Sequence, residues 1–446
     1  MGTPLNPVHD LPPQAKVMPT AEVCAAAARI VDDVVTRGRS LDAVAARHLS
    51  KLPLRRHSEA RAIAWGTVRW LYRYRPLLHR YLRQPLRRRD GSLEALLLCA
   101  LYQYHHLDEP DYAVTTGSVE AATRLGRPRA RGLINAVLRS HLRDSRAALT
   151  SDEETCYATP AWLIKRLRHA WPGHWQQVLE SANQHPPMTL RVNVARTDRD
   201  SYLRRLAVAD IPAQPSNLSP WGVLLERAMP VTKLPGFAEG EVSVQDAAAQ
   251  VTPFFSGQLA GCRVLDACAA PGGKCSQLLE LEPTITSLTA LDRPGRVYTI
   301  RENLLRLGLN CNVTGGDALV PGNWWDGQAF DLIVLDAPCS GTGVMRRHPD
   351  IRVHRRHSDI ANYANKQEQL LEALWPLLTP GGRLLYITCS VLPEENDGPL
   401  HNLVSRQADA RPELVTTAEG LATDLGCQFL PGPYHDGLYY ARIRKD

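Results

Sequence analysis

From Arg263 to its C-terminus, the chain alternates between short apolar runs and longer stretches whose apolar residues recur at helical spacing. The apolar runs cover residues 263–267, 287–291, 312–314, 331–335 and 383–387, and the helical patterns lie near 274–281, 296–307 and 359–378. Parallel strands need crossover connections, which are usually helices, so the alternation predicts a parallel sheet covered by helices. A last apolar run, 437–443, predicts an antiparallel strand. We therefore expect an α/β domain over residues 241–446.

The preceding residues show other patterns. Residues 1–19 are rich in proline and lack periodicity, which predicts a flexible lead. Residues 20–150 carry apolar stripes at helical spacing, which predict an all-α domain, and residues 151–188 predict a helical connector. Residues 189–240 predict a small α+β module, similar to an RNA-recognition (RRM-like) fold, because short alternating runs flank one helical pattern.

Basic residues are concentrated in the predicted all-α domain. The chain has 52 Lys and Arg against 46 Asp and Glu, a net charge of +6. Residues 51–90 alone contain 12 basic and 2 acidic residues, a local net charge of +10. Such a face is typical of proteins that bind phosphate backbones, although a solvated helical surface is the alternative. Five aromatic residues there are either packing residues or platforms for bases: Trp65, Trp70, Tyr72, Tyr74 and Tyr81.

The cysteines argue against both a disulfide framework and a structural metal. All ten are scattered, without a Cys-x-x-Cys pair or a Cys/His cluster at zinc spacing. No secretory signal is visible, and no apolar stretch reaches the roughly 20 residues that span a bilayer. We therefore expect a cytoplasmic chain with free thiols, no metal and no membrane contact.

Three successive strand ends in the α/β domain carry residues suited to a nucleoside. Residues 266–274 place a Gly-Gly turn after the first strand, and the next two strands end at Asp292 and at Asp317. Ligands of such sheets bind at the carboxyl ends of the strands. Neither a Gly-x-Gly-x-x-Gly fingerprint nor a Walker motif is present, so S-adenosylmethionine is favoured over a dinucleotide or a nucleoside triphosphate. Coincidental turns and helix caps are the alternative.

Cys339 and Cys389 each lie just past a predicted strand, whereas a lone cysteine within a strand is usually a small core residue. Cytosine C5 is too weak a nucleophile to accept a methyl group unaided. A thiolate that adds to C6 raises the electron density at C5, so a pair of thiols beside a cofactor site suits methylation of a pyrimidine ring carbon.

The motifs around these residues resemble those of the RNA cytosine-C5 methyltransferases. The resemblance rests on Asp-Ala-Cys-Ala-Ala-Pro-Gly-Gly-Lys at 266–274, Leu-Asp-Ala-Pro-Cys-Ser-Gly-Thr-Gly at 335–343 and Thr-Cys-Ser-Val-Leu-Pro-Glu-Glu-Asn at 388–396. The match is closest to the RsmB (Fmu/Sun) type, which acts on 16S rRNA. Residues 132–139 are similar to the NusB-like RNA-binding domain of that type. The implied fold is a NusB-like helical domain, an α+β module and a Rossmann-like methyltransferase domain.

The resemblance also implies roles for individual residues. Cys389 is expected to attack C6, and Cys339 to assist release of the methylated RNA. Asp336 and Lys274 are expected near the target base, and Arg346, Arg347 and His348 along the RNA path. The expected contacts to S-adenosylmethionine are Cys268, Ala269, Ala270, Pro271, Gly272, Gly273, Lys274, Asp292, Asp317 and Asp336.

The sequence departs from the family pattern at Cys275, at Gly341 and at residues 293–295, and the last departure affects the expected ribose contact of Asp292. We expect a monomer that modifies a single-stranded or unstacked cytosine. One alternative is the same chemistry on transfer RNA. Another is a noncatalytic RNA-binding assembly factor that has kept the fold.

Overall fold

The computed structural model describes residues 20–144 and 152–446, and the predicted flexible lead, residues 1–19, lies outside them. The chain divides into two compact units. The first contains the residues up to Arg166, Ala182–Gln184 and Met345–Arg355, and the second contains Leu167–Ser181, His185–Val344 and Arg356–Asp446. None of the described helices is long and apolar enough to cross a membrane.

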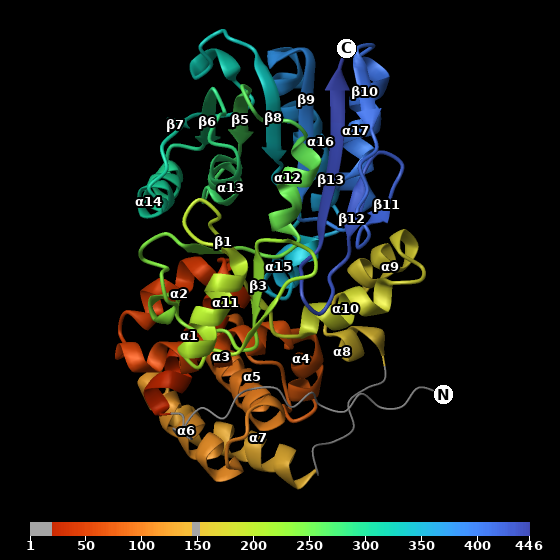
Figure 1. Cartoon of the computed structure of the whole chain (residues 1–446). Coiled ribbons are helices and arrows are strands. Elements are labelled where there is room, and N and C mark those ends of the chain that lie inside the picture. Colours follow the sequence, from red (N-terminus) through yellow and green to blue (C-terminus); the bar gives the residue numbers. More distant parts are fainter. Residues whose placement is uncertain (1–19, 145–151) are drawn as a thin grey trace. The chain divides into compact units, whose positions relative to one another are not determined.

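The first unit is all-α, as predicted (Figure 1). Helix α5 is its centre and packs against α1, α3 and α6. The apolar residues of α5 are buried on every side of the helix, which is typical of a helix enclosed by others. The helices are α1 (Ala21–Arg37), α2 (Leu41–Leu49), α3 (His57–Arg69), α4 (Leu71–His79), α5 (Gly91–His106), α6 (Asp111–Arg124), α7 (Arg131–Arg143), α8 (Glu153–Tyr157) and α15 (Ile351–His354).

The aromatic residues of the basic stretch serve mainly as packing residues. Tyr74 is buried, and Trp65, Trp70 and Tyr81 pack against the helical core. The Tyr72 hydroxyl donates to the carbonyl of Arg352 at 3.1 Å. These contacts favour packing over base stacking for this group.

A segment distant in sequence, Met345–Arg355, belongs to the helical unit. The buried Arg352 guanidinium donates to the carbonyl of Ala158 at 3.0 Å and to Oδ1 of Asn183 at 2.7 Å. Asp350 accepts the backbone N–H of Leu41 at 3.1 Å, at the start of α2. The chain that follows the Cys339 motif is therefore built into the helical core.

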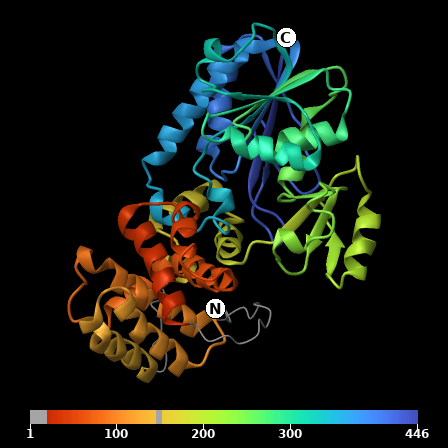
Figure 2. The same cartoon turned by 90° about the vertical axis from the view of Figure 1, so that its left-hand side faces the viewer.

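The second unit begins with a small antiparallel sheet (Figure 2). Its strand order is β2-β3-β1-β4, and helix α11 packs on β2 and β3. Strand β4, at the start of the predicted α/β domain, pairs with β1 of this sheet. Its elements are β1 (Met188–Val192), α11 (Arg199–Val208), β2 (Ala213–Pro215), β3 (Gly222–Leu225) and β4 (Val242–Val244), whereas α9 (Ala161–Ala170) and α10 (Trp175–Asn183) have residues in both units.

Nine strands of the described chain form the large sheet. Its order is β11-β12-β13-β9-β8-β5-β6-β7, with β10 paired to β13. Strands β5 to β9 are parallel and β13 is antiparallel to β9, as predicted. The strands are β5 (Arg263–Ala267), β6 (Ser287–Asp292), β7 (Asn312–Gly315), β8 (Phe330–Asp336), β9 (Leu378–Thr388), β10 (Ala410–Glu413), β11 (Leu421–Ala422), β12 (Cys427–Phe429) and β13 (Leu438–Lys445).

Helices cover both faces of this sheet. Leu371 and Leu400 bring α16 and α17 onto one face, and Leu278 and Ile300 bring α13 and α14 onto the other, together with α12. Strand β5 pairs with β6 on one side and with β8 on the other, so the order of the strands along the sheet reverses at β5. Such a reversal opens a crevice at the carboxyl ends of the strands. The helices are α12 (Thr252–Ser256), α13 (Gly273–Leu281), α14 (Val297–Leu307), α16 (Asp359–Leu374) and α17 (Asp397–Arg406).

Candidate active site

The loop after β5, which contains the predicted cofactor residues 268–274, folds back over the end of that strand. Its backbone is fixed by hydrogen bonds from Ala269 N–H to the carbonyl of Leu291 at 3.0 Å and from Gly272 N–H to that of Ala269 at 2.6 Å. Gly272 has φ +93°, and a Cβ there would lie 3.3 Å from Ile300 Cγ2. Glycine is therefore required at this turn, which brings bare backbone to the carboxyl end of β5.

Asp292 and Asp317 stand at the next two strand ends. The buried Asp292 carboxylate accepts the N–H of Ala270 at 2.8 Å and that of Arg293 at 2.7 Å, so it also braces the glycine loop. Asp317 is exposed and accepts the N–H of Leu319 at 3.0 Å. The three predicted parts of the cofactor site thus meet along one edge of the sheet, with the ribose contact of Asp292 still a prediction.

Lys274 and Asp336 form an ion pair next to this loop, with 2.6 Å between Nζ and Oδ2. Burial lowers the pKa of Lys274, but Asp336, Tyr440 and Asp266 together outweigh this effect and the net shift is upward. The lysine is therefore a fixed cation at neutral pH.

Asp266, which was not among the predicted site residues, lies fully buried at the end of β5. Its Oδ2 accepts the N–H of Cys275 at 3.0 Å, whereas its Oδ1 accepts no hydrogen bond from the described residues. Burial raises the pKa of this carboxyl to about 7. A buried polar oxygen without a partner is costly unless a ligand satisfies it.

These residues fit S-adenosylmethionine. The buried Oδ1 of Asp266 has no hydrogen-bond partner among the described residues and suits the ammonium of an amino-acid moiety, and the turn at Gly272 allows close approach to the backbone. Asp292 ends β6 and Asp317 follows the adjacent strand β7, so both offer carboxylates to a nucleoside.

The two predicted thiols meet at the ends of neighbouring parallel strands. Asp336 of β8 is paired with Ile387 of β9, so Cys339 and Cys389 leave the sheet side by side. Their Sγ atoms are 3.3 Å apart, and both side chains are half-buried. The hydrogen bond to Cys389, together with burial, raises the pKa of the Cys339 thiol well above its usual value. The Cys339 thiol therefore keeps its proton at neutral pH.

A residue of the small sheet also supports the cofactor loop. Arg191 of β1 is buried and donates to the Gly273 carbonyl at 2.8 Å and to the Ser276 hydroxyl at 3.0 Å. It therefore holds the first turn of α13. In the sequence, Arg191 is one residue of an alternating strand pattern, and this pattern does not indicate a contact with the cofactor loop.

The structure corrects one expectation from the motif after Cys339. Arg346 is only 1% exposed, so its predicted place along the RNA path is wrong. Arg347 and His348 belong to the same helical unit, where His348 Nδ1 lies 3.4 Å from Oδ2 of Asp42. The spacing of charges in a motif does not reveal burial.

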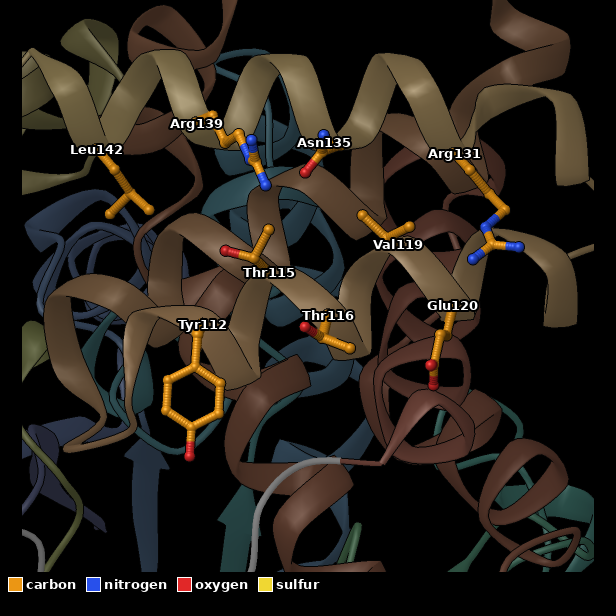
Figure 3. Close-up of a pocket in the computed structure, with 9 residues that line it drawn as sticks. All are labelled: Tyr112, Thr115, Thr116, Val119, Glu120, Arg131, Asn135, Arg139 and Leu142. Carbon is orange, nitrogen blue, oxygen red and sulfur yellow. The ribbon is translucent and has the colours of Figure 1, made fainter.

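The helical unit contains a groove of about 400 Å³ between α6 and α7. Figure 3 shows the lining residues Arg131, Asn135 and Arg139 on α7 and Tyr112, Thr115 and Glu120 on α6. Two guanidinium groups and one carboxylate line it, so the groove is basic on balance. It lies outside the basic stretch that the sequence singled out, residues 51–90.

Three family models match the chain. Residues 259–444 match the model described as 16S rRNA methyltransferase RsmB/F, residues 159–232 match a ferredoxin-like domain of RsmF/B-like methyltransferases, and residues 25–143 match the NusB family. These matches confirm the predicted three-part fold, in which the α+β module is ferredoxin-like.

Similar curated proteins include ribosomal RNA small subunit methyltransferase B of Pseudomonas syringae pv. tomato, which is 42% identical to this chain. The alignment covers 94% of this chain and 96% of the relative. A probable methyltransferase of the same description from Coxiella burnetii is 39% identical, with 95% and 99% covered.

Among solved structures, PH0851 has a TM-score of 0.79 at 20% identity and covers 94% of this chain and 99% of its own. A methyltransferase homolog from Pyrococcus horikoshii has a TM-score of 0.57 at 27% identity, with 66% and 97% covered.

Proposed function

Because this chain belongs to the 16S rRNA methyltransferase RsmB/F family, we propose that it methylates C5 of one cytosine in small-subunit rRNA, with Cys389 as the nucleophile. Family membership makes the chain an rRNA methyltransferase with a cofactor of the S-adenosylmethionine type. The proposal adds the methylated atom and the covalent route.

The observation that carries the proposal is the thiol pair. The Sγ atoms of Cys339 and Cys389 lie 3.3 Å apart beyond the carboxyl ends of β8 and β9, and Asp336, which pairs with Lys274, immediately precedes the turn of Cys339. Methylation of an exocyclic nitrogen or a ribose oxygen has no use for a cysteine nucleophile. Methylation of a pyrimidine ring carbon requires one, because the carbon must first be activated.

The cysteines would act in sequence on a cytosine drawn out of its stack. The thiolate of Cys389 forms a bond to C6, and electron density moves to C5. Bound S-adenosylmethionine would supply the electrophilic methyl group. A base then takes the C5 proton, the double bond between C5 and C6 forms again, and the bond between Cys389 Sγ and C6 breaks with its electron pair returning to sulfur.

Cys339 suits a part in the release step. Its raised pKa keeps it protonated beside the sulfur of Cys389, so it can donate a hydrogen bond to the departing thiolate. Lys274 and Asp336 lie at the same edge, where a cation and a carboxylate can orient the polar atoms of the base.

The cofactor would be held by the glycine loop, residues 268–274, and by the carboxylates of Asp266, Asp292, Asp317 and Asp336. A structure of NSun6 from Pyrococcus horikoshii with SFG has a similar fold, with a TM-score of 0.57 at 18% identity.

The helical unit would provide a further contact to the rRNA. Arg131 and Arg139 face the same groove and can each neutralise a phosphate, and Tyr112, 66% exposed, offers an aromatic face to a base (Figure 3). We assign this groove to a single-stranded stretch of the substrate.

Two substitutions test the covalent route. We expect Cys389→Ala to abolish transfer of labelled methyl groups to 16S rRNA, and Cys339→Ala to accumulate a covalent RNA adduct that is visible as a shifted band on a denaturing gel. Cys156→Ala, at an exposed cysteine, is the control. Full activity of Cys389→Ala would refute the proposal.

Bisulfite sequencing of rRNA and tRNA from a deletion strain identifies the substrate. We expect one 16S rRNA cytosine to lose its methyl group while the tRNA cytosines keep theirs. A change confined to tRNA would favour the tRNA alternative.

A further inference from the structure

The residues that follow the two cysteines are joined by one buried carboxylate. Glu395 accepts the N–H of Ser340 at 2.6 Å, the hydroxyl of Ser340 at 2.5 Å and the hydroxyl of Ser390 at 2.7 Å. Ser340 follows Cys339 and Ser390 follows Cys389 in the sequence. The Glu395 carboxylate therefore links the turn of Cys339 to the turn of Cys389 through hydrogen bonds.

Further polar side chains form hydrogen bonds around the Glu395 carboxylate. The hydroxyls of Thr342 and Ser390 lie 3.1 Å apart, and Thr342 also accepts the N–H of Val391 at 3.0 Å. Asn396 donates to the carbonyl of Ser390 at 3.1 Å, and Gln367 donates to that of Pro338 at 3.0 Å. Both cysteine turns are thus bound through the backbone as well as through the serines.

We propose that Glu395 is a positioning residue whose buried carboxylate holds the turns of Cys339 and Cys389 together and so sets the distance between their sulfur atoms. The proposal rests on the proposed function for the catalytic meaning of that distance. Its structural part, the control of the thiol pair by Glu395, stands on the hydrogen bonds alone.

The burial of Glu395 supports this role. The side chain of Glu395 is fully buried. Burial removes water from the carboxylate and raises the pKa of Glu395 above its ordinary value. Three donors converge on the carboxylate and offset that cost. Its charge also contributes to the raised pKa of Cys339, so the same group favours a protonated thiol beside Cys389.

Glu394 provides a matched control, because it is an adjacent carboxylate on the same turn and is exposed. We expect Glu395→Ala to lower kcat for methylation of 16S rRNA about 100-fold while the cofactor KM stays within about twofold, since small misplacements of reacting groups cost roughly this factor. We expect Glu394→Ala to retain wild-type kcat. A kcat for Glu395→Ala within threefold of wild type would overturn the proposal.

The conservative variant Glu395→Gln shows whether Glu395 acts through its hydrogen bonds or through its negative charge. We expect Glu395→Gln to keep kcat within about fivefold, because the amide oxygen can still accept the Ser340 N–H and its NH₂ can donate to the two hydroxyls. A loss equal to that of Glu395→Ala would refute positioning by hydrogen bonds. If Glu395→Ala does not fold, the double variant Ser340→Ala/Ser390→Ala must lower kcat at least tenfold, and wild-type kcat would overturn the proposal.

A second measurement does not depend on methylation. Diamide takes two electrons and two protons from neighbouring thiols and leaves a disulfide, and peptide mapping reports the Cys339–Cys389 bond. We expect this bond to form about tenfold more slowly in Glu395→Ala than in Glu395→Gln, which lacks the same charge but keeps the hydrogen bonds. An unchanged rate overturns the proposal. A slowed rate in a protein that does not methylate cytosine refutes the proposed function and leaves the positioning role standing.

Discussion

Arg191 of the small sheet and Glu280 of the cofactor helix α13 form a buried two-point ion pair. Arg191 Nε lies 3.0 Å from Oε2 of Glu280, Nη2 lies 2.9 Å from Oε1, and the side chains are 1% and 2% exposed. Two parallel charge-assisted hydrogen bonds fix both position and orientation. The ferredoxin-like module is therefore part of the support of the cofactor loop.

Arg191→Met should destabilise the protein by about 3–5 kcal/mol, because it leaves the buried Glu280 carboxylate without its partner. Denaturant unfolding measures the effect. Arg205→Ala breaks a more exposed ion pair with Glu241 in the same module and should cost less than about 1 kcal/mol. Arg191→Met/Glu280→Leu should recover most of the loss, and a double variant as unstable as Arg191→Met would contradict the explanation.

Asp266 predicts a pH dependence of cofactor binding. Its carboxyl has a pKa of about 7 when buried, so it is mainly protonated at pH 5.5 and half ionised at pH 7. If it receives the ammonium of S-adenosylmethionine, affinity should rise about tenfold between pH 5.5 and 7.0, a range in which an α-amino group stays charged. Calorimetric titration measures this dependence. Asp266→Asn should abolish it, and an unchanged slope in that variant would rule out the contact.

The same carboxyl predicts the sign of a stability change. Its pKa in the folded state is raised above the ordinary 3.8, so its contribution favours folding most at low pH and declines as pH rises from about 4 to 7. The stability of Asp266→Asn relative to wild type should therefore increase between pH 4 and pH 7. An equal difference in the free energy of unfolding between Asp266→Asn and wild type at pH 4 and at pH 7 would contradict this expectation.

The groove of the helical unit predicts a change in the salt dependence of RNA binding. Arg131→Ala/Arg139→Ala should reduce the slope of log K against log salt by about 2, one unit for each lost phosphate contact. Filter binding of 16S rRNA fragments at several salt concentrations measures the slope. Arg406→Ala, at an exposed arginine on α17, should leave it unchanged. Equal slopes for all three proteins would exclude the groove as an RNA contact.

Local patterns were sufficient to predict much of this molecule. The alternation of strands and helices after Arg263 predicts the parallel strands of the large sheet, because apolar periodicity reflects which side of an element is buried. The ends of the strands then place the glycine loop, Asp292 and the two cysteines on one edge. Any parallel sheet with these connections would do the same.

Only the tertiary structure shows how these residues are supported. The burial of Asp266 and the convergence of Ser340 and Ser390 on Glu395 depend on strand pairing and side-chain packing between residues distant in sequence. Arg346 shows the opposite case, since a residue of a recognised motif is buried in the helical unit. Sequence by itself determined the elements and the chemical groups available, because these follow from local spacing. Packing decided which groups are enclosed, paired or left open to a ligand.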